Sequence, residues 1–314
     1  SDVEKFEKSV AEYVGSKYCV ALNSCTDALY LALRALKIGQ GDEVLVPSRT
    51  FVASAQVIVQ VGATPVYYDL DSDIRGLITD KTVAIIPVHI EGHIDDHFGE
   101  ILDLANELDL YVIEDSAQAF GATYNGQKAG SIGDAGAFSF YPAKTLGAYG
   151  DAGALVTNNE DIYNYVKDCR NHFKDDARDW GVNSRLDNLQ AAILNVKFKY
   201  YDGALARRKE IAEDYFHKLS VALPLKPLGL PQRIDGRIWQ DYIVRCNNKD
   251  ERDELYDYLK EKGIETLKNN YPFPVPKMPQ AQKYEDETLR LPCNELLTDE
   301  EVNYVIDNVN KFYV

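Results

Sequence analysis

The sequence predicts an α/β protein, with a large domain built around a mostly parallel sheet and a smaller C-terminal α+β domain. Two observations carry this prediction. Short apolar segments alternate with helical segments up to residue 157, which is typical of parallel strands that are joined by helices and covered on both faces. A long helical stretch then leads into a mixed remainder. The chain of 314 residues is long enough for both domains, and we expect residues 1–205 to form the large one and residues 206–314 the small one.

The expected elements of the large domain begin with a helix at residues 3–14, where apolar residues recur at helical spacing before Gly15. A short apolar strand at residues 18–22 is followed by a polar turn and by a helix at residues 28–36. Further strands are expected at residues 43–46, 64–68, 83–88, 110–113, 135–140 and 154–157, and further helices at residues 51–61 and 100–108.

The C-terminal third of the sequence has a different pattern. Residues 187–219 favour a long helical stretch. Three prolines then mark a transition between domains: Pro224, Pro227 and Pro231. The remainder predicts a strand at residues 239–245, a charged helix at 250–262, a proline-rich loop at 271–279 and a final helix from about residue 299.

The composition is that of a globular protein with an acidic surface, with 45% hydrophobic residues and a net charge of −16. A chain this acidic is not expected to bind nucleic acid. No apolar run approaches the roughly 18 residues of a membrane-spanning helix, and the charged N-terminus has no apolar core typical of a signal peptide. The five cysteines are scattered and include no CxxC pair. We therefore expect a cytoplasmic protein with reduced thiols and no membrane contact.

Lys144 lies between a short aromatic run and a glycine-rich turn, in the stretch 139–153. Lysine is rarely buried, so a lysine among apolar and small residues calls for a reason. A desolvated lysine loses its charge easily and can attack an aldehyde to form a Schiff base. The alternative is a surface lysine on a loop, and other parts of the sequence must decide between the two.

Asp115 comes at the end of a short apolar segment that predicts a buried strand. A carboxylate in that position is unfavourable unless a partner pairs with it. A protonated pyridine nitrogen is such a partner, and the contact between aspartate and pyridinium is the usual electronic device of pyridoxal phosphate enzymes. The alternative is a carboxylate that caps the next turn.

The polar turn at residues 23–27 joins a predicted strand to a predicted helix. This geometry points free backbone N–H groups at an anion, although Ser24 or Thr26 could equally be a plain helix cap. The turns at residues 47–51 and 115–118 also follow predicted strands. Because ligands of such sheets bind beyond the carboxyl ends of the strands, the three turns are expected to line one site.

Two other patterns are not expected to form binding sites. Three histidines are spaced by four residues from His89 to His97, but Gly92 interrupts the helix that would align them as metal ligands. The glycines between Gly147 and Gly153 do not directly follow a strand that opens a βαβ unit, as a dinucleotide-binding loop does. We therefore expect no metal site and no Rossmann-type dehydrogenase.

Five segments, in their order and spacing, resemble the DegT/DnrJ/EryC1/StrS family, the pyridoxal-phosphate-dependent sugar aminotransferases of fold type I. They span residues 23–29, 47–53, 113–121, 138–153 and 183–192, and the resemblance extends from Val3 through the terminal helix. It implies a large three-layer α/β/α domain and a smaller C-terminal α+β domain. It also implies a homodimer with shared active sites, in which Asn183 reaches the cofactor phosphate bound to the other subunit.

The resemblance implies a catalytic role for two residues. Lys144 is expected to hold the cofactor as a Schiff base and to carry the proton that moves between cofactor and substrate. Asp115 is expected to keep the pyridine nitrogen protonated. The residues implied to bind the cofactor are Cys25, Thr26, Asp27, Phe51, Asp115, Gln118, Ser139, Lys144 and Asn183.

Within this set, the resemblance implies distinct contacts. Gln118 would hydrogen-bond the 3-oxygen of the cofactor ring, and Phe51 would stack on the ring face. The backbone N–H groups of Thr26 and Asp27, together with the hydroxyl of Ser139, would bind the phosphate at the N-terminus of a helix.

The stretch after Lys144 bears on the substrate. Residues 145–151 resemble those of family members that aminate C3 of a keto sugar, whereas members that aminate C4 more often carry Thr-Thr-Gly-Glu-Gly-Gly there. The resemblance therefore implies transfer of an amino group from glutamate to a nucleotide-linked 3-keto-deoxyhexose, with pyridoxamine phosphate as the aminated form of the cofactor. A 4-keto sugar or a cyclitol as the substrate is an alternative.

Several segments depart from the family pattern. Cys25 stands where glycine is common, residues 92–96 differ from the usual Gly-Gln-Pro sequence, and Lys277 stands where histidine is common. These departures leave the sugar and its nucleotide open. The family usually has further residues before Val3, so a non-catalytic member that retains the fold is a second alternative.

Overall fold

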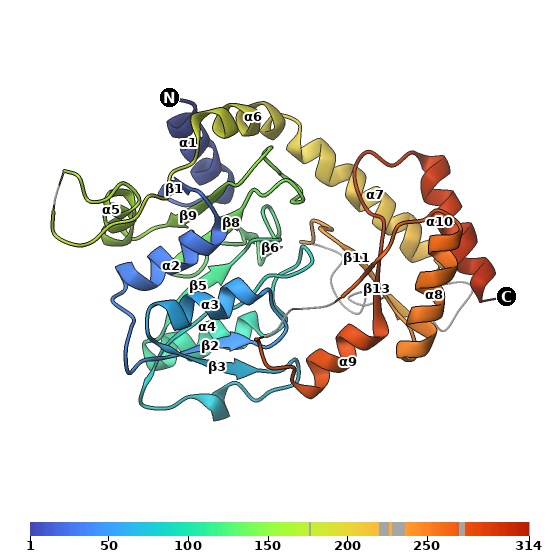
Figure 1. Ribbon diagram of the computed structural model, residues 1–314, viewed down its shortest axis with the longest axis horizontal. Helices are drawn as coiled ribbons and strands as arrows, with labels where there is room; N and C mark the ends of the chain where they lie inside the picture. The colour runs from blue at the N-terminus through green and yellow to red at the C-terminus, as the bar shows by residue number, and fades with distance from the viewer. Residues whose placement is uncertain (176, 220–225, 228–235, 270–273, 314) are drawn as a thin grey trace.

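A seven-stranded sheet lies at the centre of the larger part of the computed structural model (Figure 1), which describes residues 1–175, 177–219, 226–227, 236–269 and 274–313. The strands are ordered β1-β9-β8-β5-β4-β2-β3. Their bounds are β1 (Tyr18–Leu22), β2 (Glu43–Pro47), β3 (Thr64–Tyr68), β4 (Thr82–Ile85), β5 (Tyr111–Asp115), β8 (Ala135–Ser139) and β9 (Gly153–Thr157). Strand β9 runs antiparallel to both neighbours and the other neighbouring strands are parallel, which confirms the predicted sheet.

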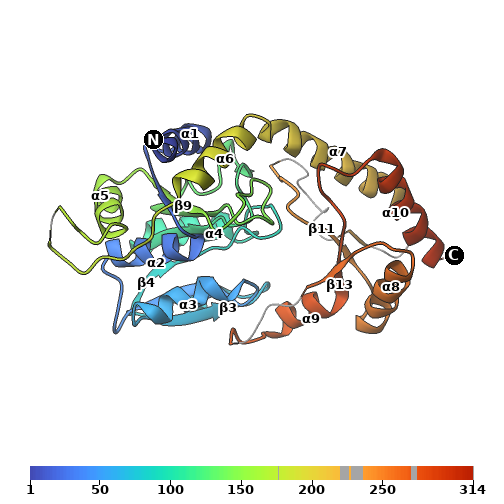
Figure 2. The ribbon, with the colours of Figure 1, turned by 45° about the horizontal axis from the view of Figure 1, so that its top comes forward.

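Helices cover both faces of this sheet (Figure 2). The covering helices are α1 (Asp2–Val14), α2 (Cys25–Ala35), α3 (Val52–Gln60), α4 (Phe98–Leu108), α5 (Glu160–Cys169) and α6 (Asn188–Phe198). Successive side chains of a strand point to opposite faces. In β2, Val44 and Val46 pack in the apolar cluster that includes α2, α3 and α5, whereas Leu45 packs in the cluster that includes α4. The three predicted layers are therefore present.

Helix α2 begins at Cys25, earlier than the predicted start at residue 28. Ser24 is its N-cap, and the Ser24 hydroxyl accepts a hydrogen bond from the N–H of Asp27 at 3.1 Å. This cap draws the polar residues of the predicted turn into the first turn of the helix. The side chains that follow β1 are thus held in a rigid geometry.

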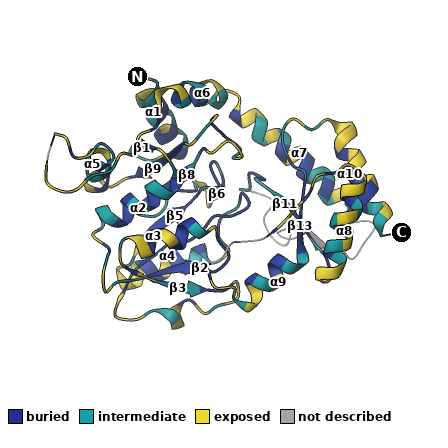
Figure 3. Cartoon of the chain, viewed as in Figure 1, coloured by how far each residue is buried: buried dark blue, intermediate teal, exposed yellow. Residues whose placement is uncertain are grey.

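The C-terminal part of the molecule is built on a second sheet, ordered β10-β11-β13-β12 with antiparallel pairs. Its strands are β10 (Lys226–Pro227), β11 (Tyr242–Arg245), β12 (Leu267–Lys268) and β13 (Thr288–Leu291). Helices α7 (Tyr201–Leu219), α8 (Lys249–Glu261) and α10 (Asp299–Phe312) share an apolar cluster with it and leave their outer faces exposed (Figure 3). This arrangement confirms the predicted α+β class.

Several elements differ from the prediction. The helical stretch at residues 187–219 consists of two helices, α6 and α7. Strand β11 begins only at Tyr242, because Trp239 has a φ of 53°, in the left-handed region that an extended strand does not allow. The sequence pattern did not indicate α5, α9 (Pro279–Glu287), β12, β13, the 3-10 helix at Arg75–Leu77, or the hairpin of β6 (Thr123–Tyr124) and β7 (Gln127–Lys128).

Two predictions concern the junction between the two parts. Pro224 and Pro231 lie outside the described residues, as do residues 271–273 of the proline-rich loop. The domain boundary after residue 205 falls within α7 and stays a prediction. Within the described residues, no helix is long and apolar enough to cross a membrane.

Candidate active site

The predicted cofactor residues come together at the carboxyl ends of the central strands. Asp115 is the last residue of β5, Ser139 is the last residue of β8, and Cys25 opens the helix that follows β1. The Cys25 thiol lies 3.8 Å from Asp115 Oδ1. The turns after these strands therefore line one site, as expected for ligands of an open α/β sheet.

The carboxylate of Asp115 is buried and receives hydrogen bonds on both oxygens. Ser54 Oγ donates to Oδ2 at 2.6 Å, and the N–H of Ala117 donates to Oδ1 at 3.2 Å. The Ser54 hydroxyl also lies 2.7 Å from Thr50 Oγ1. Ser54 and Thr50 were not identified from the sequence. The sequence offered one signal for them: Thr50 lies within the matching segment at residues 47–53, and Ser54 directly follows it.

Lys144 lies on the loop after β8 with its side chain half-buried. Burial lowers the pKa of the Lys144 ammonium, and the nearby charges of Asp115 and Asp241 oppose this shift. A lysine with a lowered pKa holds more of its amine in the neutral, nucleophilic form. This environment favours the reactive lysine over the surface lysine.

The loop that carries Lys144 is fixed on both sides of the lysine by Gln240. The Gln240 Oε1 accepts from the N–H of Thr145 at 3.2 Å, and its Nε2 donates to the carbonyl of Ala143 at 3.2 Å. Thr145 Oγ1 also lies 2.8 Å from the hydroxyl of Tyr201. The backbone is therefore anchored, and movement at this position is left to the lysine side chain. Gln240 precedes β11 and was not identified from the sequence.

The N-terminus of α2 is the predicted phosphate site. Two backbone N–H groups were predicted to bind the phosphate, those of Thr26 and Asp27. The N–H of Asp27 donates to the Ser24 cap, whereas the N–H of Thr26 does not. Ser184 Oγ donates to Asp27 Oδ2 at 2.6 Å and accepts from the N–H of Asn23 at 3.2 Å. Ser184 therefore connects the Asp27 carboxylate to the backbone that precedes α2.

Gly153 brings the predicted phosphate ligands together. In the sheet it pairs with Leu22 of β1 on one side and with Ser139 of β8 on the other. A Cβ at Gly153 would lie 2.2 Å from the carbonyl carbon of Ser24, so only glycine lets β9 approach the start of α2 this closely. Ser139 is therefore placed beside the N-terminus of α2.

Three further predicted residues surround this centre. Gln118 Oε1 accepts a hydrogen bond from the N–H of Glu91 at 2.7 Å, which leaves the amide NH2 as its donating end. Phe51 precedes α3 and is 59% exposed, so its ring is accessible for stacking. Asn183 is exposed and forms an isolated bridge with Asn171.

The histidine spacing does not form a metal site in the described part of the chain, where no group of three or more metal-ligating side chains is present. His89 is buried and pairs with Glu114, with 3.0 Å between Nε2 and Oε2. The other ring nitrogen accepts from the N–H of Asp95, so Nε2 is the donor. Glu114 also accepts three backbone N–H bonds, from Gly130, Ile132 and Gly133. This buried carboxylate has a structural role in the turn before β8.

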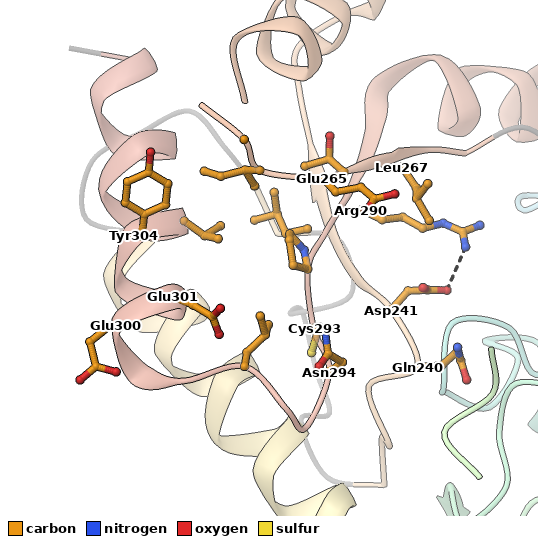
Figure 4. Close-up of a pocket in the computed structure, with 17 residues that line it drawn as sticks. Gln240, Asp241, Glu265, Leu267, Arg290, Cys293, Asn294, Glu300, Glu301 and Tyr304 are labelled. Atoms are coloured by element: carbon orange, nitrogen blue, oxygen red, sulfur yellow. Dashed lines mark hydrogen bonds and ion pairs between the residues drawn. The ribbon is translucent and has the colours of Figure 1, made fainter. Parts of the chain in front are cut away.

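A cavity of about 680 Å³ adjoins the site on the side of the second sheet (Figure 4). Gln240 and Asp241 lie at its near end, where Arg290 Nη1 is 3.1 Å from Asp241 Oδ2. Burial raises the pKa of Asp241, and Arg290 opposes that shift. Glu265, Glu300 and Glu301 also line the cavity. The volume suits an organic ligand, but the acidic lining does not favour a phosphate, which is better placed at α2.

This set of residues fits pyridoxal phosphate. A half-buried lysine with a lowered pKa can bind an aldehyde, a buried carboxylate can pair with a pyridinium, and a helix N-terminus beside a serine can hold a phosphate. The fold and the site together define a class, the pyridoxal-phosphate-dependent enzymes of fold type I.

The chain belongs to the DegT/DnrJ/EryC1/StrS aminotransferase family, which matches residues 1–310. It is 39% identical over 335 residues to a dTDP-3-amino-3,6-dideoxy-alpha-D-galactopyranose transaminase of Aneurinibacillus thermoaerophilus, covering 99% of this chain and 90% of that protein. It is 36% identical over 337 residues to a pleiotropic regulatory protein of Geobacillus stearothermophilus, covering 99% of this chain and 89% of that protein. The solved structure of S. venezuelae DesV is 34% identical, with a TM-score of 0.91, and the match covers 100% of this chain and 89% of that chain. The family depends on pyridoxal phosphate, and solved relatives include its pyridoxal and pyridoxamine forms.

Proposed function

We propose that this protein transfers the amino group of glutamate to a nucleotide-linked keto-deoxyhexose, with the ketone at C3, in the biosynthesis of an amino sugar. The observation that carries the proposal is the half-buried Lys144, with its lowered pKa, in the field of Asp115. Residues 145–151 favour the C3 position, and the relative from Aneurinibacillus thermoaerophilus is named for a 3-amino sugar. Glutamate as the donor follows from the family resemblance.

The relative named as a regulatory protein favours a second candidate, a protein that keeps the fold without catalysis. The site argues against it. Desolvating a lysine is unfavourable, and a protein that only binds a partner gains nothing from a lysine amine with a lowered pKa. The catalytic function is therefore the preferred conclusion.

Bound pyridoxal phosphate supplies an aldehyde that accepts amines and a ring that withdraws electrons from the substrate carbon. Lys144 would provide the neutral amine that holds it. The same amine would act as a general base and then as a general acid at that carbon. Asp115 would hold the proton on the pyridine nitrogen, and Gln240 would keep the lysine loop in place.

The remaining predicted ligands would have distinct roles. The N–H of Thr26, in the first turn of α2, and the hydroxyl of Ser139, at the end of β8, would bind the phosphate. The exposed ring of Phe51 would stack on the cofactor ring. The NH2 group of Gln118 would donate to the 3-oxygen. The Cys25 thiol lies 3.8 Å from Asp115 Oδ1, and its contact with the cofactor stays a prediction.

The proposed function is tested by following the two half-reactions separately. Purified protein mixed with pyridoxal phosphate should develop the visible absorbance of the lysine-bound cofactor. Glutamate should remove this absorbance and yield stoichiometric 2-oxoglutarate. Keto sugars linked to dTDP, UDP or GDP, and a keto-inositol, are then offered to the aminated protein, and the acceptor is the one that restores the absorbance. An absorbance that glutamate leaves unchanged would contradict the proposal.

We also propose that the active sites are completed in a homodimer. Helix α6 and its surroundings expose four large apolar side chains, between 56% and 77% exposed: Tyr149, Leu189, Val196 and Tyr200. Exposed apolar groups gathered in one region are typical of an interface. Tyr149 belongs to this region because its N–H donates to Gln190 Oε1 on α6 at 2.9 Å. Asn183 lies on the segment that leads into α6.

Mixing two inactive variants tests this sharing of sites. Lys144→Ala removes the lysine and Asn183→Ala removes the side chain expected to act on the other subunit. A hybrid dimer then contains one doubly defective site and one intact site, so equal amounts that reassociate fully should regain about a quarter of the wild-type activity. If Asn183 acts within its own subunit, the mixture gives only the average of the two variants.

The compartment and the domain boundary are further proposals. All five cysteines are free and buried, which supports a location in the reducing cytoplasm. The C-terminal sheet has an apolar cluster of its own, whose first residue is Ile211, and this supports two domains, at residues 1–205 and 206–314.

A further inference from the structure

Glu91 is a buried carboxylate with a strained backbone, and the proposed chemistry does not use it. It is 5% exposed, and its φ of 60° lies in the left-handed region that a residue with a Cβ rarely adopts. It directly precedes the stretch at residues 92–96 that departs from the family pattern. At the next position, a Cβ on Gly92 would lie 2.6 Å from the backbone nitrogen of Gln240. The turn is thus packed tightly against the segment before β11. Surrounding contacts must stabilise the strained backbone of Glu91.

Two residues from distant parts of the chain hold the Glu91 carboxylate. Arg49 Nη2, just after β2, lies 2.5 Å from Oε1. The hydroxyl of Tyr284 on α9 lies 2.8 Å from Oε1 and 2.7 Å from Oε2. The Arg49 guanidinium also stacks on the Tyr284 ring, 3.7 Å from its centroid. Burial opposes ionisation of Glu91, but the charge and hydrogen bond of Arg49, together with His93 and Tyr284, outweigh it and lower the pKa of Glu91. Removing one partner of such a buried pair is strongly destabilising.

The backbone of Glu91 reaches a predicted cofactor ligand. Its N–H donates to Gln118 Oε1 at 2.7 Å. A free amide can present either its oxygen or its NH2 to a neighbour, and only the NH2 can donate to the 3-oxygen of pyridoxal phosphate. The bond from Glu91 occupies the amide oxygen and thereby selects the productive orientation.

We propose that Glu91 is a positioning residue for Gln118, held in its left-handed conformation by Arg49 and Tyr284 so that its N–H turns the NH2 of Gln118 toward the cofactor. This inference rests on the proposed function, because it requires Gln118 to bind the cofactor ring. Helix α9 is itself bound to the loop that follows β3, where the N–H groups of Gln280 and Ala281 each donate to Asp69 at 2.8 Å (Figure 1). The C-terminal part of the chain, through α9, therefore helps to position Gln118, which belongs to the large domain.

A double-mutant cycle between Glu91 and Gln118 tests the proposal, with the dissociation constant of pyridoxal phosphate as the readout. Glu91→Gln keeps the shape of the side chain and removes its charge, and Gln118→Ala removes the amide. We expect Glu91→Gln to weaken cofactor binding about tenfold. Without the ion pair that holds Glu91, Gln118 would lose its orientation and with it one hydrogen bond to a charged group, the 3-oxygen of the cofactor. In the Gln118→Ala background the same change should have little effect on binding. Equal effects in both backgrounds would overturn the proposal.

Thermal unfolding of the cofactor-free proteins separates positioning from a general loss of stability. Glu91→Gln should lower the melting temperature equally in both backgrounds, because Arg49 loses its charged partner in each. Tyr284→Phe removes only a hydroxyl and is the variant to use if Glu91→Gln does not fold; it should give the same non-additive pattern with a smaller amplitude.

Glu7→Gln is the matched control. It breaks a part-buried ion pair between α1 and Arg170, with 2.5 Å between the charged atoms, and has no contact with Gln118. It should lower stability and leave cofactor affinity unchanged. The two levels of inference fail differently. Wild-type protein that binds no pyridoxal phosphate contradicts the proposed function, whereas normal binding with an additive cycle contradicts only the role of Glu91.

Discussion

Replacing Lys144 by alanine is expected to abolish transamination and to remove the absorbance of lysine-bound pyridoxal phosphate. One side chain supplies both the amine that holds the cofactor and the base that moves the proton, so both functions are lost together. General base catalysis alone contributes about 10²–10⁴-fold to a rate, so turnover should fall by at least that factor. A coupled assay for 2-oxoglutarate and an absorbance scan of the same sample measure the two effects.

Two control variants identify the amine as the cause. Lys144→Arg keeps the positive charge, but a guanidinium does not deprotonate and forms no Schiff base, so this variant should be as inactive as Lys144→Ala. Lys197→Ala removes a neighbouring lysine, whose Nζ donates to the carbonyl of Gly147 at 2.5 Å, and should keep the absorbance. An absorbance that persists in Lys144→Ala and disappears in Lys197→Ala would mean that Lys197, and not Lys144, forms the Schiff base.

The fold could be predicted in outline because the strands of a buried parallel sheet are short apolar runs between polar turns. The bounds of β1 and β3 agree with the predicted residues 18–22 and 64–68. The C-terminal part could be predicted less well. Helix α9 carries few apolar residues, and it is fixed by Asp69 and Glu91, which are far from it in sequence. No local pattern records such contacts.

The same limit applies to the site. Lys144 and Asp115 could be proposed as site residues from the sequence because a charged side chain among apolar residues requires a chemical reason. Ser54 and Gln240 carry no such mark, since a serine on a helix and a glutamine before a strand are both common. Ser54 is separated from Asp115 by 61 positions and Gln240 from Thr145 by 95. Their roles exist only once the chain has folded and brought these pairs within hydrogen-bonding distance.

Asp115→Asn is expected to retain pyridoxal phosphate and to lose about 10²–10³-fold in turnover, the usual effect of removing one preorganised electrostatic group from an active site. The substitution preserves the local structure. The amide oxygen can accept from the N–H of Ala117, and the amide NH2 can donate to Ser54 Oγ, because a hydroxyl rotates to accept as readily as it donates.

The lost rate then reports charge rather than shape. A neutral amide does not stabilise a pyridinium, so the ring gives up its proton and withdraws electrons less strongly from the substrate carbon. Ser54→Ala is the complementary variant, since it removes a hydrogen bond from Asp115 and keeps the carboxylate, and its turnover should lie much closer to wild type. Cofactor binding by titration and single-turnover rates with glutamate measure the two properties independently. Asp115→Asn with turnover equal to that of Ser54→Ala would mean that Asp115 acts only by holding the turn after β5, and the pyridinium role would be wrong.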